Sequence, residues 1–394
     1  MKLTGGRNPP RWIWDETLAY AKDCQILFHD VHLPYYLSSV GAHIANLRNR
    51  SRQFFGRTGE FADLRLHTLI IAPPGFSKSF LQNFLFNPRS GVIAEPCLPS
   101  KDISFTTEAA LVGSFDENGD EVEGSAKEKW NGFLYTDELS SVLNQTQTTH
   151  SKNMLDALLR ILDRGQVSKP MKQGSIKYET CCTAVFGTQQ ERLDVRSGLD
   201  RRLFILDCTP NSHDRDLYFD AFVAGTGVAP DMERVTALRD ATSILFRDFD
   251  IDKMVIDPAL YRFCKKLGMA HTDLIMFERL AVGYSVFNSW DYGIPVLKVV
   301  LDSQLEGMIE RAWKWRKAFR EEGLQIIKLI DERDWGTTEL KNFLVRPPFS
   351  IRWEESGNRI DRLLRREFLS SCRKTLTGAK KPTTFLARGP QWPY

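Results

Sequence analysis

Apolar residues recur at three- and four-residue spacing near the start of the chain, over residues 12–20 and 36–50, which predicts two helices. From Leu66 the pattern changes to short apolar runs separated by helical stretches. That alternation is typical of a parallel sheet with helices on both faces. We therefore expect an α/β core with strands at Thr68–Ile71, Val92–Ala94, Gly132–Thr136, Thr180–Gly187 and Leu203–Asp207.

Two hairpins are predicted between these strands. A helical stretch over residues 107–112 gives way to the turn residues 116–120, DENGD, so a hairpin interrupts a helix there. A second hairpin is expected over residues 166–178, with its turn between Pro170 and Gly174. Three lysines decorate this basic hairpin, although an ordinary surface hairpin would have the same pattern: Lys169, Lys172 and Lys177.

The second half of the chain is mostly helical in pattern. Helices are expected at Asp257–Leu267, Met276–Trp290 and Val296–Arg320, with turns at Gly268 and Gly293. Beyond residue 323 the pattern predicts helices at Leu324–Arg333, Thr338–Val345 with Thr337 as cap, and Ser356–Ser371, and then a β-hairpin. Three helices and a hairpin are typical of a winged-helix domain, which binds DNA or docks on a protein.

Length and composition bound the class of protein. The chain has 394 residues, of which 42% are hydrophobic and 26% charged, as in globular proteins of two or three domains. No apolar run is long enough for a membrane span, and the first residues lack the apolar centre of a signal peptide. Seven cysteines without metal-ligand spacing fit a reducing compartment. We therefore expect no membrane partner and a cytoplasmic, nucleoid-associated location.

Charge is distributed unevenly along the chain. The net charge is only +3, yet residues 323–394 contain 14 Lys and Arg against 8 Asp and Glu. A basic end on a near-neutral body favours a polyanion partner such as DNA, although a solvated basic surface is also common. The candidate DNA contacts of this region are Arg359, Arg362, Arg365, Arg366, Lys380 and Lys381.

The stretch LHTLIIAPPGFSKS, residues 66–79, has the pattern of a strand, a phosphate-binding loop and a helix N-terminus. Backbone N–H groups would hold the phosphates of ATP, Lys78 would add a positive charge, and the Ser79 hydroxyl would bind Mg²⁺. The usual first and last glycines of such a loop are replaced by Ala72 and Ser77. The alternative is a Pro-rich turn before a core helix. The candidate nucleotide-binding residues are Ala72, Pro73, Pro74, Gly75, Phe76, Ser77, Lys78 and Ser79.

Two carboxylates close the third predicted strand. Asp137 is placed to hold Mg²⁺ and Glu138 to polarise the attacking water, although acidic residues also favour helix N-termini. The next strand ends at Thr188, whose hydroxyl would reach the γ-phosphate or the water. An arginine-rich segment, residues 192–202, follows and would supply an arginine finger to a neighbouring subunit.

This order of parts resembles the AAA+ ATPases, and more closely the ATPase core of the MCM replicative helicases. Four features are similar: APPGFSKS, the hairpin-interrupted helix FTTEAALVGSFDENGDEVEGSA, TDE at residues 136–138, and the hairpin VSKPMKQGSIKY before CCTAVFGT. The resemblance covers about residues 60–210. It implies that the basic hairpin grips DNA, that Thr188 is sensor 1, and that Arg201, or else Arg202 or Arg196, is the trans arginine finger. A helical lid would then carry Arg279 as sensor 2.

The resemblance implies four regions: an N-terminal helical region (1–60), an AAA+ core (61–215), a helical lid (216–322) and a winged helix (323–394). It implies an ATP-driven DNA helicase or translocase that acts as a ring, with a hexamer as the expected form, in DNA replication. The front end is too short for the family's N-terminal domain, which suggests a reduced relative from a mobile element or virus. The alternative is an ATP-dependent DNA-binding switch or loader that recruits a partner without unwinding.

Overall fold

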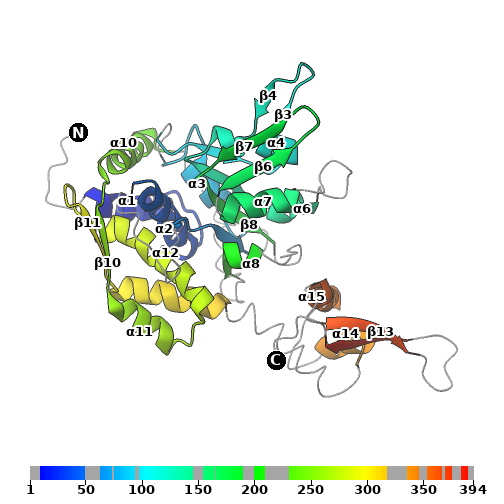
Figure 1. Cartoon of the computed structure of the whole chain (residues 1–394). Coiled ribbons are helices and arrows are strands. Elements are labelled where there is room, and N and C mark those ends of the chain that lie inside the picture. Colours follow the sequence, from blue (N-terminus) through cyan, green and yellow to red (C-terminus); the bar gives the residue numbers. More distant parts are fainter. Residues whose placement is uncertain are drawn as a thin grey trace.

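The computed structural model of the chain describes residues 9–48, 63–72, 75–93, 97–144, 154–163, 165–189, 199–208, 230–316, 335–345, 353–365, 369–374 and 383–388. Figure 1 shows a body built around one sheet, with two hairpins extending from it, and a smaller C-terminal group of helices and strands. No helix in these ranges is both long enough and apolar enough to cross a membrane.

A five-stranded parallel sheet lies at the centre of the body, in the order β2–β5–β8–β1–β9. Because β8 lies between β1 and β5, the carboxyl ends of these three strands meet at one edge. Four of the five predicted strands are confirmed with shifts of a few residues at their ends. The strands are β1 (Thr68–Ile71), β2 (Ser100–Asp102), β5 (Phe133–Thr136), β8 (Thr183–Thr188) and β9 (Phe204–Asp207).

The second predicted strand is wrong. The N–H groups of Val92 and Ile93 donate to the carbonyls of Phe84 and Leu85, near the end of helix α3 (Lys78–Phe86), and both side chains are buried there. The edge strand is instead β2, whose sequence Ser-Lys-Asp is mostly exposed. An edge strand pairs on one side only and needs no apolar run, so the hydrophobic pattern gave no signal for it.

Alternate residues of the strands enter two separate cores, so the predicted sheet with two covered faces is confirmed. Ile70 and Val185 belong to one core, and Ile71 and Phe186 belong to the other. Helices α1 (Pro9–Asp23), α2 (His29–Arg48), α3, α10 (Met232–Asp248), α11 (Pro258–Lys266) and α12 (His271–Asn288) contribute to the first core. Helices α4 (Glu108–Val112), α5 (Ser125–Glu128), α6 (Leu139–Asn144), α7 (Met154–Asp163) and α8 (Leu199–Arg202) contribute to the second.

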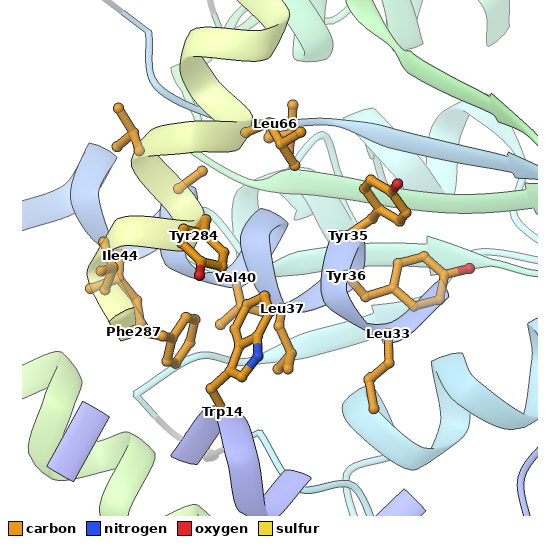
Figure 2. Close-up of a cluster of buried hydrophobic side chains, with 14 of the residues drawn as sticks. Trp14, Leu33, Tyr35, Tyr36, Leu37, Val40, Ile44, Leu66, Tyr284 and Phe287 are labelled. Carbon is orange, nitrogen blue, oxygen red and sulfur yellow. The ribbon is translucent and has the colours of Figure 1, made fainter. Parts of the chain in front are cut away.

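The two N-terminal helices pack against α12, and α2 also packs against the sheet. Residues 32–45 of α2 are all buried, because the helix is packed between the sheet and α12. Trp14 of α1 lies edge-on to Tyr284 of α12, with ring centroids 5.3 Å apart, and also contacts Phe287 (Figure 2). The described parts of the expected N-terminal region and of the expected lid therefore share one hydrophobic core with the sheet.

Two glycines allow α2 and α12 to touch through their backbones. A Cβ atom on Gly283 would lie 1.8 Å from the carbonyl oxygen of Ser38, and one on Gly41 would lie 2.1 Å from the carbonyl oxygen of Gly283. Both distances are far below van der Waals contact, and the opposing atoms are backbone atoms that no side-chain rotation can move. The crossing therefore depends on glycine at both positions.

We expect Gly283→Ala to destabilise the fold by about 3 kcal/mol, because its methyl group must push two buried helices apart. Gly307→Ala is the matched control: it lies in the helical residues 303–316 with no atom within 4 Å of the added Cβ. That control should stabilise the protein by about 0.5–1 kcal/mol through helix propensity. Urea unfolding midpoints, compared at a common m-value, test whether the two substitutions change the free energy of unfolding in opposite directions. Equal midpoints for the two variants would contradict the close crossing.

Both predicted hairpins are confirmed. Strands β3 (Gly113–Phe115) and β4 (Glu121–Glu123) interrupt the helical residues of α4 and α5, and β6 (Gln166–Pro170) pairs with β7 (Ser175–Glu179). Figure 1 shows the two hairpins next to each other, extending from the end of the body that carries α4. Gly174 at the turn of the second hairpin faces the ring of Phe115 in the first.

The helical region after the sheet contains a pair of short parallel strands that sequence analysis missed. The predicted helix from Val296 is wrong at its start, because β11 (Val296–Val299) pairs in parallel with β10 (Lys253–Ile256), and helix begins only at residue 303. Buried and exposed residues alternate along β10 and β11, and this period-two signal is short enough to fit a helix as well. The predicted turns at Gly268 and Gly293 are confirmed by their positive φ angles.

The described C-terminal elements are two helices and a three-stranded antiparallel sheet in the order β12–β14–β13. The predicted hairpin is confirmed, but the helix before it ends at Arg365, so the predicted end at Ser371 is wrong: residues 369–374 pair in the sheet. Gly336, not Thr337, occupies the N-cap position. The helix predicted at 324–333 lies outside the described residues. The elements are β12 (Trp335–Gly336), α14 (Thr337–Leu344), α15 (Trp353–Arg365), β13 (Leu369–Lys374) and β14 (Thr383–Arg388).

Candidate nucleotide site at the carboxyl edge of the sheet

The predicted phosphate loop follows β1 directly and ends at the first turn of α3. Ala72 extends the strand, since its N–H donates to the carbonyl of Thr188 at 3.2 Å, and its φ is not positive, so alanine fits where the usual motif has glycine. Gly75 and Ser77 both have positive φ, at 83° and 55°. Ser77 therefore occupies a left-handed position that favours glycine. Pro73 and Pro74 lie outside the described residues.

Phe76, in the middle of the loop, is buried and packs on Phe28, with ring centroids 5.0 Å apart. Phe28 precedes α2, so the N-terminal helices help to fix the loop. His32, one turn into α2, is fully buried, and burial together with the nearby charge of Lys78 lowers its pKa to about 3. Because this imidazole is neutral, it adds no second positive charge beside the Lys78 ammonium.

Lys78 begins α3 and is almost completely buried. Its ammonium group donates to the carbonyl oxygen of Ala72, so the side chain folds back along the loop. Burial lowers the pKa of Lys78, and the carboxylates of Glu138 and Asp137 partly oppose that shift. A Cβ atom on Gly187 would lie 3.4 Å from the lysine side chain and 3.0 Å from the Asp137 carbonyl, so this glycine leaves room where β5 and β8 end.

Ser79 and Asp137 meet across the sheet edge. The Ser79 hydroxyl donates to Asp137 Oδ2 at 2.5 Å, although the two residues are 58 positions apart in sequence. A hydroxyl and a carboxylate are hard oxygen ligands, and Mg²⁺ in nucleotide sites takes one or two protein oxygens of this kind along with phosphate and water. The pair therefore fits the predicted magnesium site.

Glu138 is held by two hydroxyl groups. Thr188 Oγ1 donates to Glu138 Oε1 at 2.7 Å, and Ser140 Oγ donates to the same oxygen at 2.5 Å. The carboxylate is thus fixed between the end of β8 and the start of α6, and its second oxygen is not engaged by either hydroxyl. An oriented carboxylate at this place is suited to act as a general base.

Sequence analysis missed several residues that support the site. Ser140 holds Glu138, and Gln82 of α3 donates to the carbonyls of Thr136 and Val185, which joins the helix to the end of β5 and to the middle of β8. The Ser104 hydroxyl lies 3.0 Å from Thr136 Oγ1. Only the spacing of Ser140, two residues after Glu138, offered a signal in sequence; the other contacts join segments that are far apart along the chain.

Two of the three candidate arginines lie at the amino ends of the strands, at the end of the sheet opposite the phosphate loop. Arg201 and Arg202 end α8, just before β9 begins. Arg201 is exposed, whereas Arg202 forms an ion pair with Asp163 at 2.9 Å. Arg196 lies outside the described residues.

Arg279 also lies away from the phosphate loop. It belongs to a buried charged cluster near the start of β1, where Arg65 forms a salt bridge with Asp63 at 2.8 Å. Burial opposes ionisation of Asp63, yet Arg65 holds its pKa down at about 2. Burial lowers the pKa of Arg279 itself, and Asp63 partly opposes this. The structure does not bring Arg279 to the phosphate loop.

The candidate DNA-binding lysines differ in their surroundings. Lys172 and Lys177 are exposed on the basic hairpin, whereas Lys169 pairs with Glu108 at 3.1 Å. In the C-terminal group, helix α15 carries three of the candidate arginines, Arg359, Arg362 and Arg365. The remaining candidates, Arg366, Lys380 and Lys381, lie outside the described residues.

A scan against models of protein families and a search among curated proteins found no match for this chain. The proposals that follow therefore depend on its motifs and geometry.

Proposed function

We propose that this chain is an ATPase that moves along or unwinds DNA, with an MCM-like AAA+ core. The observation that carries this proposal is the convergence of Lys78, the Ser79–Asp137 pair and the Thr188–Glu138 pair at one sheet edge. These groups follow or end three different strands, and the first and last of them, Lys78 and Thr188, are 110 positions apart in sequence. A Pro-rich turn before a core helix would not require that convergence.

Each residue of the site has a distinct task in this proposal. The N–H groups at the start of α3 and the Lys78 ammonium bind the phosphates, and Ser79 and Asp137 hold Mg²⁺, which neutralises charge on the phosphate oxygens. Glu138 accepts the proton of the attacking water, and Thr188 orients the carboxylate. The buried loop and α2 exclude bulk water from one side.

The positions of the arginines support a head-to-tail assembly. Arg201 is exposed at the amino edge of the sheet, while the phosphate loop lies at the carboxyl edge. An exposed arginine at the amino ends of the strands serves a phosphate only if the site belongs to a neighbour. Repeated head-to-tail contacts that close generate a ring. We propose a ring, with six subunits as the expected number, in which each site is completed by the next subunit.

Two parts of the chain would contact DNA. The basic hairpin presents Lys172 and Lys177 to solvent, and lysines on a hairpin suit phosphate contacts that do not depend on sequence. The C-terminal helices and antiparallel sheet support a winged helix in which α15 approaches the DNA.

ATP turnover with and without single-stranded DNA tests the proposal. The parent chain should hydrolyse ATP faster with DNA, and Lys78→Ala should lose nucleotide binding and turnover together. A parent chain that binds ATP and DNA but neither hydrolyses ATP nor displaces a strand would instead favour the nucleotide-gated switch or loader. Failure to bind ATP at all would overturn the nucleotide site itself.

A further inference from the structure

Lys169 differs from the other two lysines of the basic hairpin. Its ammonium lies 3.1 Å from Glu108 Oε2 and donates to the carbonyl of Gly113 at 3.3 Å, and only 18% of the side chain is exposed. Lys172 and Lys177 are exposed, and neither forms an ion pair with another residue of the described chain. A lysine already held by a carboxylate and a carbonyl is poorly placed to neutralise a DNA phosphate.

The partner of Lys169 is itself nearly buried. Glu108 is 9% exposed and is the first residue of α4, where its charge is also favoured by the helix N-terminus. Removing one member of such a pair leaves the other charge partly desolvated. The ion pair therefore holds the two segments together from a largely buried position, unlike a solvent-exposed surface ion pair.

Two further contacts fasten the basic hairpin to the β3–β4 hairpin. The Tyr178 hydroxyl donates to the carbonyl of Val112 at 3.0 Å, at the base of the hairpin. At its turn, Gly174 faces Phe115 so closely that a Cβ would lie 3.1 Å from the ring. With the Lys169 pair between them, these contacts hold the basic hairpin along its length.

Glu108 also lies at the end of a short segment that starts beside the nucleotide site. Ser104 contacts Thr136 Oγ1, and the same oxygen accepts the N–H of Glu138 at 3.3 Å. Thr107 then caps α4 by accepting the N–H of Ala110. Only three residues therefore lie between Ser104, which contacts the catalytic strand, and Glu108, which contacts the basic hairpin.

We propose that Lys169 is a positioning residue whose ion pair with Glu108 fastens the basic hairpin to the segment leading from the nucleotide site. The hairpin then follows movements of residues 104–108, while Lys172 and Lys177 contact DNA phosphates. This inference rests on the proposed function for its DNA-dependent part, and it reassigns Lys169 from DNA contact to coupling contact.

The salt dependence of DNA binding separates the two roles of lysine. For an oligothymidine, Lys172→Met and Lys177→Met should each lower the slope of log K against log salt by about 0.7, the value for one phosphate contact on a single strand. Lys169→Met should leave the slope unchanged. A loss of slope in Lys169→Met equal to that in Lys172→Met would overturn the proposal.

Glu108→Gln tests coupling without altering any lysine. We expect basal ATP turnover and the salt slope to match the parent, while stimulation by DNA falls about tenfold. The exchanged pair Glu108→Lys with Lys169→Glu should restore part of the stimulation. Glu117→Gln, which changes an exposed carboxylate on the β3–β4 turn, is the matched control and should behave as the parent. Parent-like stimulation in Glu108→Gln would overturn the coupling role.

Hydrogen exchange of residues 166–179 provides a measurement that needs neither ATP nor DNA. Amides of the basic hairpin should exchange several-fold faster in Lys169→Met and Glu108→Gln than in the parent or Glu117→Gln. Equal exchange in all four proteins would overturn the fastening contact. If the parent shows no stimulation by DNA but the exchange result holds, the proposed function fails and the contact stands.

Discussion

Replacing Glu138 with Gln is expected to lower ATP turnover by about 10²–10⁴-fold while ATP still binds, because the amide cannot accept a proton from water. The substitution keeps the shape of the side chain, and the amide oxygen still accepts the hydroxyls of Thr188 and Ser140 that fix Glu138 in the parent. Phosphate release measures the loss, and binding of a fluorescent ATP analogue measures what remains.

The control for this prediction is Glu128→Gln, which removes a carboxylate from α5 at a half-exposed position outside the site. It should change turnover by less than twofold. Turnover in Glu138→Gln within about tenfold of the parent would show that another group acts as the base. Loss of ATP binding in that variant would instead assign Glu138 to the binding of nucleotide.

Replacing Arg201 with Ala is expected to lower ATP turnover by about 10³-fold or more, the contribution measured for arginine fingers in related chemistry. The loss should appear although Arg201 lies at the end of the sheet opposite its own phosphate loop, since in the proposed ring the finger serves the next subunit. Mixing Arg201→Ala with Lys78→Ala subunits should therefore restore part of the turnover, because some interfaces then combine an intact loop with an intact finger.

Arg202→Ala is the matched control for Arg201→Ala. Arg202 is already paired with Asp163, so its loss should disturb the region around α8 without the same loss of turnover. If Arg202→Ala produces the larger loss and Arg201→Ala does not, Arg202 is the finger. If mixing the two inactive variants restores nothing, the site is completed within one subunit and the head-to-tail arrangement is wrong.

The strands that sequence analysis identified are those whose burial demands an apolar run. β1 is buried along its whole length and was located to the residue. β8 is also fully buried and was located with a shift of three residues at its start and one at its end. β2 escaped because an edge strand of Ser, Lys and Asp has no such demand. The β11 strand escaped because a run such as VLKV fits the start of a helix equally well. Local patterns do not reveal which other strand such a segment will pair with.

The residues of the candidate site also fall into two groups: those that the local sequence predicts and those that depend on contacts between distant segments. The loop, Asp137 and Glu138 follow strand ends, so their positions were predictable from the local order of residues. Ser140, Gln82 and the glycine at 187 act through contacts between segments, and a single sequence does not show which segments meet. Arg279 illustrates the opposite case, since its place in the helical region was predictable but its distance from the loop depends on how α12 packs on α2.

The backbone contact at Gly41 and Gly283 has a consequence for how force would pass through the protein. Helices that touch through backbone atoms interlock more tightly than helices separated by side chains, so sliding of α12 over α2 would require opening the core. In a ring, the energy of nucleotide binding would then rotate the sheet and its covering helices together, as one rigid body. The relative displacement would concentrate at the joints between subunits and in the projecting hairpins.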